Sequence, residues 1–123
     1  MENTKVKRNL VSRTERFAVF DGDKVVSRAY VRVPYDESKP LFIFKVKTNK
    51  SHIRQGLCRK VIEHIIESHG EENIELRPHQ TEKWGAKTTT LIKFYRSFGF
   101  KRKKSEGKVF NTMRRNADEK YFH

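Results

Sequence analysis

The residues best suited to chemistry lie in a polar loop that leads into an apolar-striped segment. Residues 51–56 read Ser-His-Ile-Arg-Gln-Gly, and residues 57–66 carry apolar side chains on a broad helical stripe. An apolar run of strand length, residues 41–46, precedes the loop. A strand, a basic glycine loop and a helix in this order bring unpaired backbone N–H groups and the positive end of a helix dipole to one point. This arrangement predicts a binding site for a pyrophosphate group.

A second informative stretch, near the C-terminus, joins a helical face to a helix stop. Leu91, Tyr95 and Phe98 recur at i, i+4 and i+7, so they share one face of a helix. Gly99 supplies the left-handed conformation that commonly ends a helix, and Phe100 returns the chain to the core. Taken alone, the stretch predicts an amphipathic helix with a glycine C-cap.

Together the two stretches resemble the GCN5-related N-acetyltransferases, the GNAT superfamily. Residues 94–100 read Phe-Tyr-x-x-x-Gly-Phe, which resembles a motif near the C-terminus of that family. Residues 53–58 resemble its acyl-CoA-binding motif, Arg/Gln-x-x-Gly-x-Gly/Ala, and the order and spacing of the two motifs also fit. Three positions depart from the family pattern. Ile53 stands where Arg or Gln is usual, Cys58 where Gly or Ala is usual, and Thr88 where an Asn often contacts the pantetheine arm.

The resemblance implies acetyl-CoA as co-substrate, without a metal. In the family an amine attacks the thioester carbonyl, a backbone N–H stabilises the oxyanion, and an acid protonates the departing thiolate. By resemblance, the backbone around Val46 makes the oxyanion contact and Tyr95 is the acid, a role that suits a phenol with a pKa of about 10. The cofactor-binding residues implied in this way are Val46, Ile53, Arg54, Gln55, Gly56, Leu57, Cys58, Arg59 and Thr88.

Other assignments of the candidate catalytic residues stay open. The general base is not identifiable: Glu75 and His79 lie on or just after the strand expected beside the site, but either fits a surface position equally well. Tyr95 also fits a core tyrosine whose hydroxyl is satisfied locally. Cys58 has no evident activating environment, so it is not expected to act as a nucleophile. The five histidines show no metal-ligand spacing.

The chain is strongly basic. It contains 28 Lys and Arg against 15 Asp and Glu, a formal net charge of +13, with a pI near 10.1. Such an excess predicts attraction to polyanions: nucleic acid, an acidic protein surface, or the phosphates of coenzyme A. The cations gather towards both ends, and those at 101–104 are expected to lie close to Arg114 and Arg115. A solvated surface that promotes solubility is the alternative.

The length of 123 residues predicts a single domain, 1–123, with a basic lead-in at 1–14 that has room for a first strand and a tail at 116–123. No apolar stretch reaches transmembrane length, and no signal-peptide pattern follows Met1. One cysteine allows no internal disulfide and fits a reducing compartment, so a cytoplasmic location is expected.

The expected fold class is α+β, in an α/β layered arrangement. A central, mostly antiparallel β-sheet is flanked by two main helices; the layout is GNAT-like but lacks the usual first two helices, because a hairpin begins within the first twenty residues. The expected elements are a hairpin of 16–20 and 24–33 turning at Asp-Gly, a buried strand at 41–47, a helix at about 54–69 with Gly70 as C-cap, a strand at 74–77, a helix capped by Thr88–Thr90, and a closing hairpin of 100–103 and 108–114.

Two functions of different classes remain open from the sequence. The first is an acetyl-CoA-dependent N-acetyltransferase acting on an amine of a protein or small-molecule acceptor, with a homodimer partner or the acceptor itself completing the acceptor side. The second is a catalytically weak or inactive GNAT-like module that binds nucleic acid or an acidic protein through its basic surface. A basic, β-rich nucleic-acid-binding domain unrelated to GNAT is a third interpretation. No membrane partner is expected.

Overall fold

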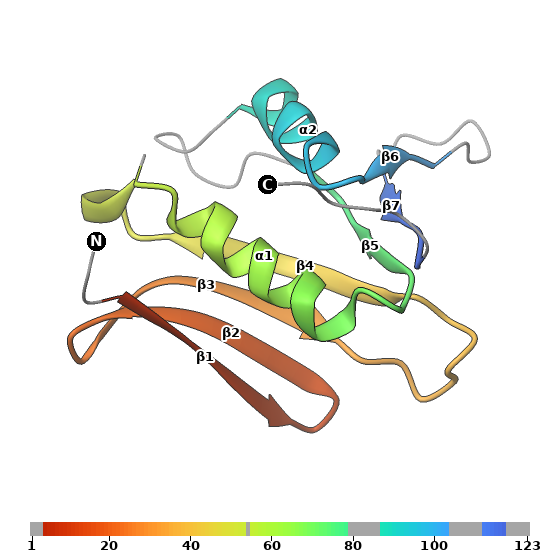
Figure 1. The fold of residues 1–123 in the computed structure, drawn as a ribbon, viewed down its shortest axis with the longest axis horizontal. Coiled ribbons are helices and arrows are strands. Elements are labelled where there is room, and N and C mark those ends of the chain that lie inside the picture. Colours follow the sequence, from red (N-terminus) through yellow and green to blue (C-terminus); the bar gives the residue numbers. More distant parts are fainter. Residues whose placement is uncertain (1–3, 54, 79–86, 104–111, 118–123) are drawn as a thin grey trace.

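One mixed β-sheet organises the fold. The computed structural model describes residues 4–53, 55–78, 87–103 and 112–117. Their strands form a seven-stranded sheet in the order β1-β2-β3-β4-β5-β7-β6 (Figure 1), antiparallel throughout except that β4 and β5 run parallel. This confirms the expected fold class. The strands are β1 (Thr4–Val11), β2 (Thr14–Asp21), β3 (Lys24–Arg32), β4 (Leu41–Thr48), β5 (Ile74–Leu76), β6 (Lys101–Arg102) and β7 (Met113–Arg115).

Two tight turns connect the first three strands. Ser12 and Arg13 have positive φ angles of 47° and 66° and join β1 to β2, while Gly22, at φ 63°, lies in the turn between β2 and β3. Two left-handed residues match the right-handed twist of paired strands, which explains the short β1–β2 connection. The expected Asp-Gly hairpin is confirmed. The lead-in at 1–14 contains a full edge strand, and the connection from β1 to β2 holds no helix.

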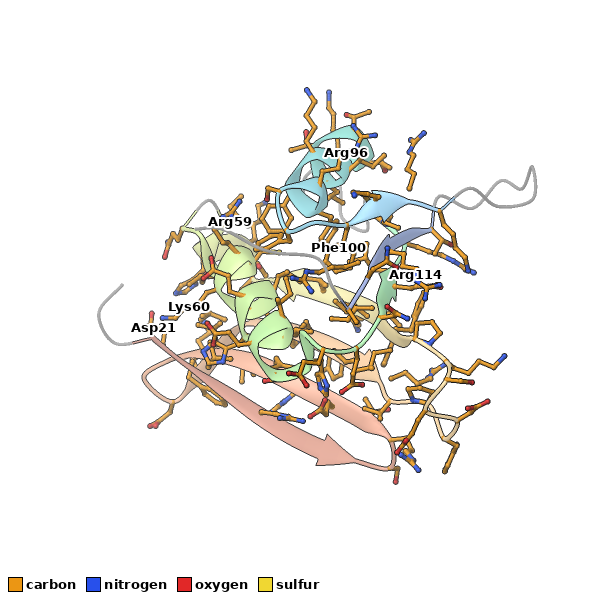
Figure 2. The ribbon with its side chains drawn as sticks, turned by 45° about the vertical axis from the view of Figure 1, so that its right-hand side comes forward. Asp21, Arg59, Lys60, Arg96, Phe100 and Arg114 are labelled. Atoms are coloured by element: carbon orange, nitrogen blue, oxygen red, sulfur yellow. The ribbon has the colours of Figure 1, made fainter. Side chains whose placement is uncertain are left out.

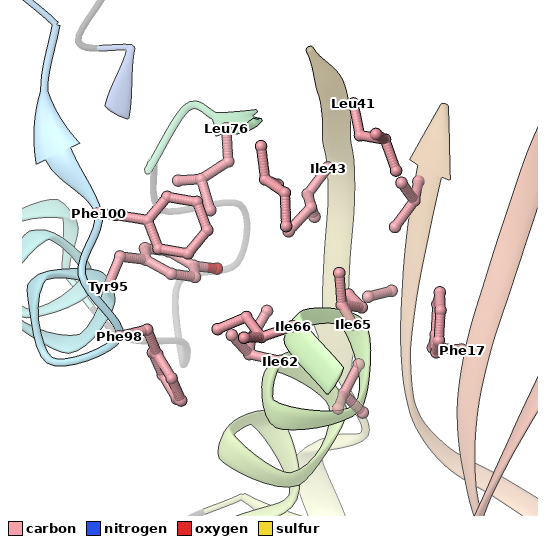
Figure 3. Close-up of a cluster of buried hydrophobic side chains, with 14 of the residues drawn as sticks. Phe17, Leu41, Ile43, Ile62, Ile65, Ile66, Leu76, Tyr95, Phe98 and Phe100 are labelled. Atoms are coloured by element: carbon pink, nitrogen blue, oxygen red, sulfur yellow. The ribbon is translucent and has the colours of Figure 1, made fainter. Parts of the chain in front are cut away.

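Helix α1 (Leu57–His69) covers one face of the sheet, in front of β2, β3 and β4 in Figure 1. Helix α2 (Thr88–Arg96) lies near β5 and β6, and its apolar face joins the same cluster of buried side chains (Figure 3). The α1 stripe is fully buried at Val61, Ile62 and Ile65. No helix in the described ranges is long and apolar enough to cross a membrane.

The C-terminal end of α2 follows the glycine stop expected from the sequence. Gly99 has a positive φ of 95°. Its N–H donates to Arg96 O at 3.0 Å, and the Phe100 N–H donates to Tyr95 O at 3.3 Å. These two bonds form a Schellman motif, and the accompanying apolar contact is present because the Tyr95 and Phe100 rings lie 5.9 Å apart, edge to face.

The starts of both helices differ from the expectation. Helix α1 begins at Leu57 rather than near 54, because Gly56 has a φ of 73°, which no α-helical residue adopts. Helix α2 has Lys87 as its N-cap and no side-chain cap, so the expected threonine cap is wrong.

Gly70 does follow α1, but in right-handed conformation with φ −61°. A Cβ there would lie 2.7 Å from Ile66 O, so close packing rather than a left-handed turn favours glycine.

Strand β4 is buried over only part of its length. Leu41 and Ile43 face the core, whereas Phe44 is 41% exposed and Lys45 is exposed. The expectation of a continuously buried strand is therefore wrong, because α1 covers one face of the sheet only. The closing hairpin is present as β6 paired with β7; its turn at 105–107 lies outside the described residues.

Candidate functional site

The start of α1 has the backbone geometry expected of an anion site. Gly56 is the N-cap in left-handed conformation, no side chain caps the helix, and its first turn contains no acidic residue. The Lys60 N–H bonds back to Gly56 O at 3.1 Å as the helix begins. An α-helix leaves its first N–H groups without intrahelical acceptors, at the positive end of its dipole. A Cβ at Gly56 would meet nothing within 4 Å, so its φ angle, not crowding, favours glycine there.

Arg59 connects the start of α1 to the end of α2 (Figure 2). Its guanidinium carbon lies 4.7 Å from the Phe98 ring centroid and 5.4 Å from that of Phe94. Its Nη2 donates to Ser97 Oγ at 3.2 Å. Arg59 was predicted only as a cofactor residue; the structure gives it a second role in fixing the two helices. Phe94 and Phe98 at i and i+4 were a sequence indication of a stacking surface.

Cys58 and Tyr95 come together from the two helices. Burial raises the pKa of the Cys58 thiol to about 12. Tyr95 is 4% exposed, and burial, followed by a charge on the nearby Cys58, raises the pKa of its hydroxyl well above the ordinary value. Figure 3 shows the Tyr95 ring beside Phe100, extending from α2 towards the side chains of α1. A raised pKa keeps the Tyr95 hydroxyl protonated throughout the neutral range but makes it a weaker proton donor than an ordinary tyrosine.

Strand β4 pairs with β5 only over the three residues of β5. Their pairing consists of Leu41 with Ile74, Phe42 with Glu75, and Ile43 with Leu76. Further along, β4 pairs with β3 alone among the described strands, through pairs that include Val46 with Ala29. Val46 is half-buried and packs against the core. Its backbone therefore lies in the stretch where β4 makes no ladder with β5, which is the position expected for an oxyanion contact.

The other predicted cofactor residues differ in how far their side chains are exposed. Ile53 is half-buried at the end of the short 3₁₀ turn η1 (Lys50–His52), and Gln55 is exposed beside Gly56. Leu57 is buried in the core, so its side chain is unavailable to a ligand, although its backbone N–H belongs to the helix start. Thr88 is the half-buried first residue of α2. Arg54 lies outside the described residues.

Of the two candidate bases, Glu75 is described and His79 lies outside the described residues. The buried Glu75 carboxylate lies 3.2 Å from Lys103 Nζ and 3.6 Å from Arg114 Nη1. Its neighbours on β5, Ile74 and Leu76, face the core, so alternation along the strand directs Glu75 to the opposite face. Glu75 thus has a structural role, as an ion-pair partner of two strands, that the sequence did not indicate. Its role as a base stays a prediction.

The C-terminal cations lie together as expected, except for Arg115. Lys101, Arg102 and Lys103 are exposed, and Lys101 pairs with Arg114 between β6 and β7. Arg115 is turned inward with Met113: it is 3% exposed, and its Nε donates to Phe98 O at 2.9 Å. Within the described ranges, no three potential metal ligands of the His, Cys, Asp or Glu type gather.

Comparison with known proteins gives a match in structure alone. No family model and no curated protein match the sequence. An acetyltransferase from Thermus thermophilus matches with a TM-score of 0.65 at 17% identity, over 85% of this chain and 64% of that one. Escherichia coli ElaA matches with a TM-score of 0.66 at 18% identity, over 87% and 71%.

A third structure matches over nearly the whole of both chains. It is a GNAT family acetyltransferase from Elizabethkingia anophelis with acetyl-CoA bound, with a TM-score of 0.70 at 8% identity, over 94% of this chain and 99% of that one. The present chain therefore spans less than two thirds of the Thermus protein but has nearly the extent of the Elizabethkingia one. At these identities the matches establish the fold, and it is the GNAT fold.

Proposed function

We propose that this chain, which has the GNAT fold, is an acetyl-CoA-dependent N-acetyltransferase. The observation that carries the proposal is the uncapped start of α1 after left-handed Gly56, on the connection between the parallel strands β4 and β5. The Elizabethkingia structure, of matching extent and with acetyl-CoA bound, supports the choice of co-substrate.

The proposal assigns tasks to the start of α1, to the β4 backbone and to Tyr95. Backbone N–H groups at the start of α1 hold the pyrophosphate, as helix N-termini commonly do. The bound co-substrate supplies an acetyl thioester. The β4 backbone around Val46 donates a hydrogen bond to the carbonyl oxygen as negative charge develops there. Tyr95 keeps its proton through the neutral range and delivers it to the leaving sulfur. Glu75 and His79 remain the candidates for accepting the amine's proton.

The co-substrate part is tested by calorimetric titration of the full chain with acetyl-CoA. We expect Gly56→Glu to abolish binding, because the new carboxylate stands against a phosphate at the helix start. Gly22→Glu is the matched control: Gly22 also has a positive φ and open space at its Cβ, but it lies in the β2–β3 turn. Both variants carry the same backbone strain, of about 1 kcal/mol. Equal acetyl-CoA affinity in the two variants would remove the cofactor site from α1.

The transfer part is tested by following free thiol release from acetyl-CoA with a panel of amines: spermidine, a lysine peptide and a peptide with a free N-terminus. Tyr95→Phe should lower turnover by on the order of 10²-fold, the lower end for general acids, because a raised pKa makes Tyr95 a weak acid. Acetyl-CoA affinity should be retained because the ring is kept. Unchanged turnover in the mutant would assign Tyr95 to the core.

A second candidate function is a GNAT-like module that binds without transferring. The observation that favours it is the burial of Tyr95, which is 4% exposed and belongs to the buried apolar cluster. Such a module would bind acetyl-CoA in the calorimeter and release no thiol with any amine of the panel. Thiol release that depends on an added amine would refute it.

A further inference from the structure

The inference concerns the face of β3 and β4 that points away from α1, here called the outer face. The pairs Ala29–Val46 and Val31–Ile43 point into the core. Side chains alternate along a strand, so the pairs between them point the other way. The outer face therefore consists of Arg28, Tyr30, Arg32, Phe42, Lys45 and Lys47, together with Phe44 at the bulge in this ladder.

Aromatic rings and cations interleave on the outer face. The Tyr30 and Phe44 ring centroids lie 5.9 Å apart. The guanidinium of Arg32 lies 5.1 Å from the Phe44 centroid, and Lys45 Nζ lies 5.9 Å from that of Tyr30. Phe44 is 41% exposed, and it is one of two large apolar side chains with high exposure among the described residues. The exposed Phe44 ring is therefore available to stack against a planar group of a ligand.

Cations dominate this face: the carboxylate that the neighbouring strand β5 brings next to Phe42, Glu75, already pairs with Lys103 and Arg114. Neither β3 nor β4 contains an acidic residue, and β2 adds Arg16, which pairs with Tyr30. A second copy of the chain would bring a like charge to the face, so self-association there is disfavoured. An acidic protein would satisfy the cations but offers few planar groups for the rings. Single-stranded nucleic acid supplies both phosphates and stackable bases.

We propose that the outer face binds single-stranded nucleic acid, with bases stacked on Phe44 and Tyr30 and phosphates held by the surrounding cations. The binding is independent of sequence, since stacking and phosphate contacts accept every base. It goes beyond the proposed acetyl transfer, because it uses the face of β4 opposite to the core and none of the residues at the start of α1.

The test is fluorescence anisotropy of the full chain with a labelled single-stranded oligonucleotide of mixed sequence, about twelve nucleotides long. Affinity should fall as salt rises from about 50 to 200 mM, with a slope of about −0.7 per phosphate neutralised. Phe44→Ala should weaken binding by roughly 5- to 150-fold, the range for loss of one base stack. Circular dichroism and thermal melting establish that the variant is folded.

The matched control is Tyr35→Ala. Tyr35 is 83% exposed and carries the Arg13 guanidinium 4.3 Å from its ring centroid, so it repeats the cation–ring pairing in the loop that follows β3. The Tyr35→Ala variant should bind the oligonucleotide with the same affinity as the wild type. The double variant Arg32→Gln, Lys45→Gln provides a second measurement that leaves Phe44 in place. It removes two cations from the outer face, so the slope of log affinity against log salt concentration should become shallower by about 1 to 2.

Three results would overturn the proposal. Equal affinities of Phe44→Ala and Tyr35→Ala would show that the outer face holds no base. Tighter binding of a duplex of the same sequence would make the contact one of charge alone. Binding of polyglutamate as tight as that of the oligonucleotide, and insensitive to Phe44→Ala, would assign the face to an acidic protein.

Discussion

The polar cluster beneath the β1–β2 hairpin gives the sharpest stability prediction. Glu15 on β2 is 1% exposed, and its carboxylate accepts a hydrogen bond from His69 Nε2 at 2.5 Å and another from Arg8 Nε. His69 is the last residue of α1, and its Nδ1 lies 3.1 Å from the half-exposed carboxylate of Glu72. His69 therefore ties the end of the helix to the sheet through a buried carboxylate.

The His69→Ala variant removes one of these two donors. Leaving a buried polar group short of a hydrogen-bond partner costs about 1 to 3 kcal/mol, and the upper end applies because Glu15 then keeps the half-exposed Arg8 as its described side-chain donor. For 123 residues the unfolding entropy is roughly 0.26 kcal/mol/K, so a loss of about 3 kcal/mol lowers Tm by about 11 °C. His69→Gln, which keeps an N–H within reach of Glu15, should lose less than half of that.

Differential scanning calorimetry measures the effect, and His52→Ala is the control. His52 Nε2 also lies close to a carboxylate, 3.1 Å from Asp21 Oδ2, but this pair is near the surface and Asp21 is 38% exposed. Exposed pairs contribute about 1 kcal/mol or less, so its Tm should fall by under about 4 °C. The reasoning fails if the two alanine variants melt together, or if His69→Gln is as unstable as His69→Ala.

Two further predictions concern Cys58 and the glycines that flank α1. With a pKa raised from 9.0 to about 12, Cys58 should react with iodoacetamide at pH 8 about a thousandfold more slowly in the folded chain than in urea; similar rates would mean an open thiol. Between pH 9 and 12 the folded state keeps the Cys58 proton that the unfolded chain releases. The free energy of unfolding is therefore unaffected by this thiol below pH 9 and falls by about 1.4 kcal/mol per pH unit as the pH rises from 9 towards 12. Cys58→Ala should make the free energy of unfolding, measured in urea, fall less steeply at alkaline pH. Gly70→Ala should cost roughly 1 to 3 kcal/mol in urea unfolding, because its Cβ would lie 2.7 Å from Ile66 O. Gly56→Ala should cost about 1 to 2 kcal/mol of unfolding free energy, through its positive φ alone, and Gly56→Asn should cost less because Asn tolerates that conformation. Equal losses in Gly56→Ala and Gly56→Asn would show that crowding, not φ, governs position 56 as it does position 70.

Local patterns in the sequence predicted local structure well. Gly99 and Phe100 end α2 as expected because the stop depends on one glycine and one apolar side chain a residue later. The turn between β2 and β3 was also predictable, because it depends on the local Asp-Gly pair alone. The start of α1 was misplaced by three residues, because the sequence does not reveal the left-handed conformation of Gly56, which excludes that residue from the helix.

Long-range contacts account for what the sequence could not predict. His69 and Glu15 are 54 residues apart, and Arg59 and Ser97 are 38 apart, so no periodicity links them. The meeting of Cys58 with Tyr95 depends on how two helices pack, which neither helix specifies alone. The glycine before α1 and the apolar face that carries Tyr95 were therefore predictable as local features, while the contacts that hold the two helices together were not.

Both described helices pack on the core side of the sheet, so no helix among the described residues covers the outer face. Ser12 and Arg13 adopt the two left-handed conformations that allow β1 to return directly as β2, where GNAT domains commonly place two helices. A sheet face left uncovered would be prone to self-association if it were apolar. On β3 and β4 the rings are instead paired with cations, as Phe44 is with Arg32, and like charges keep two such faces apart. The side chains that disfavour self-association of the outer face are thus also the ones that favour a polyanion with planar groups as its partner.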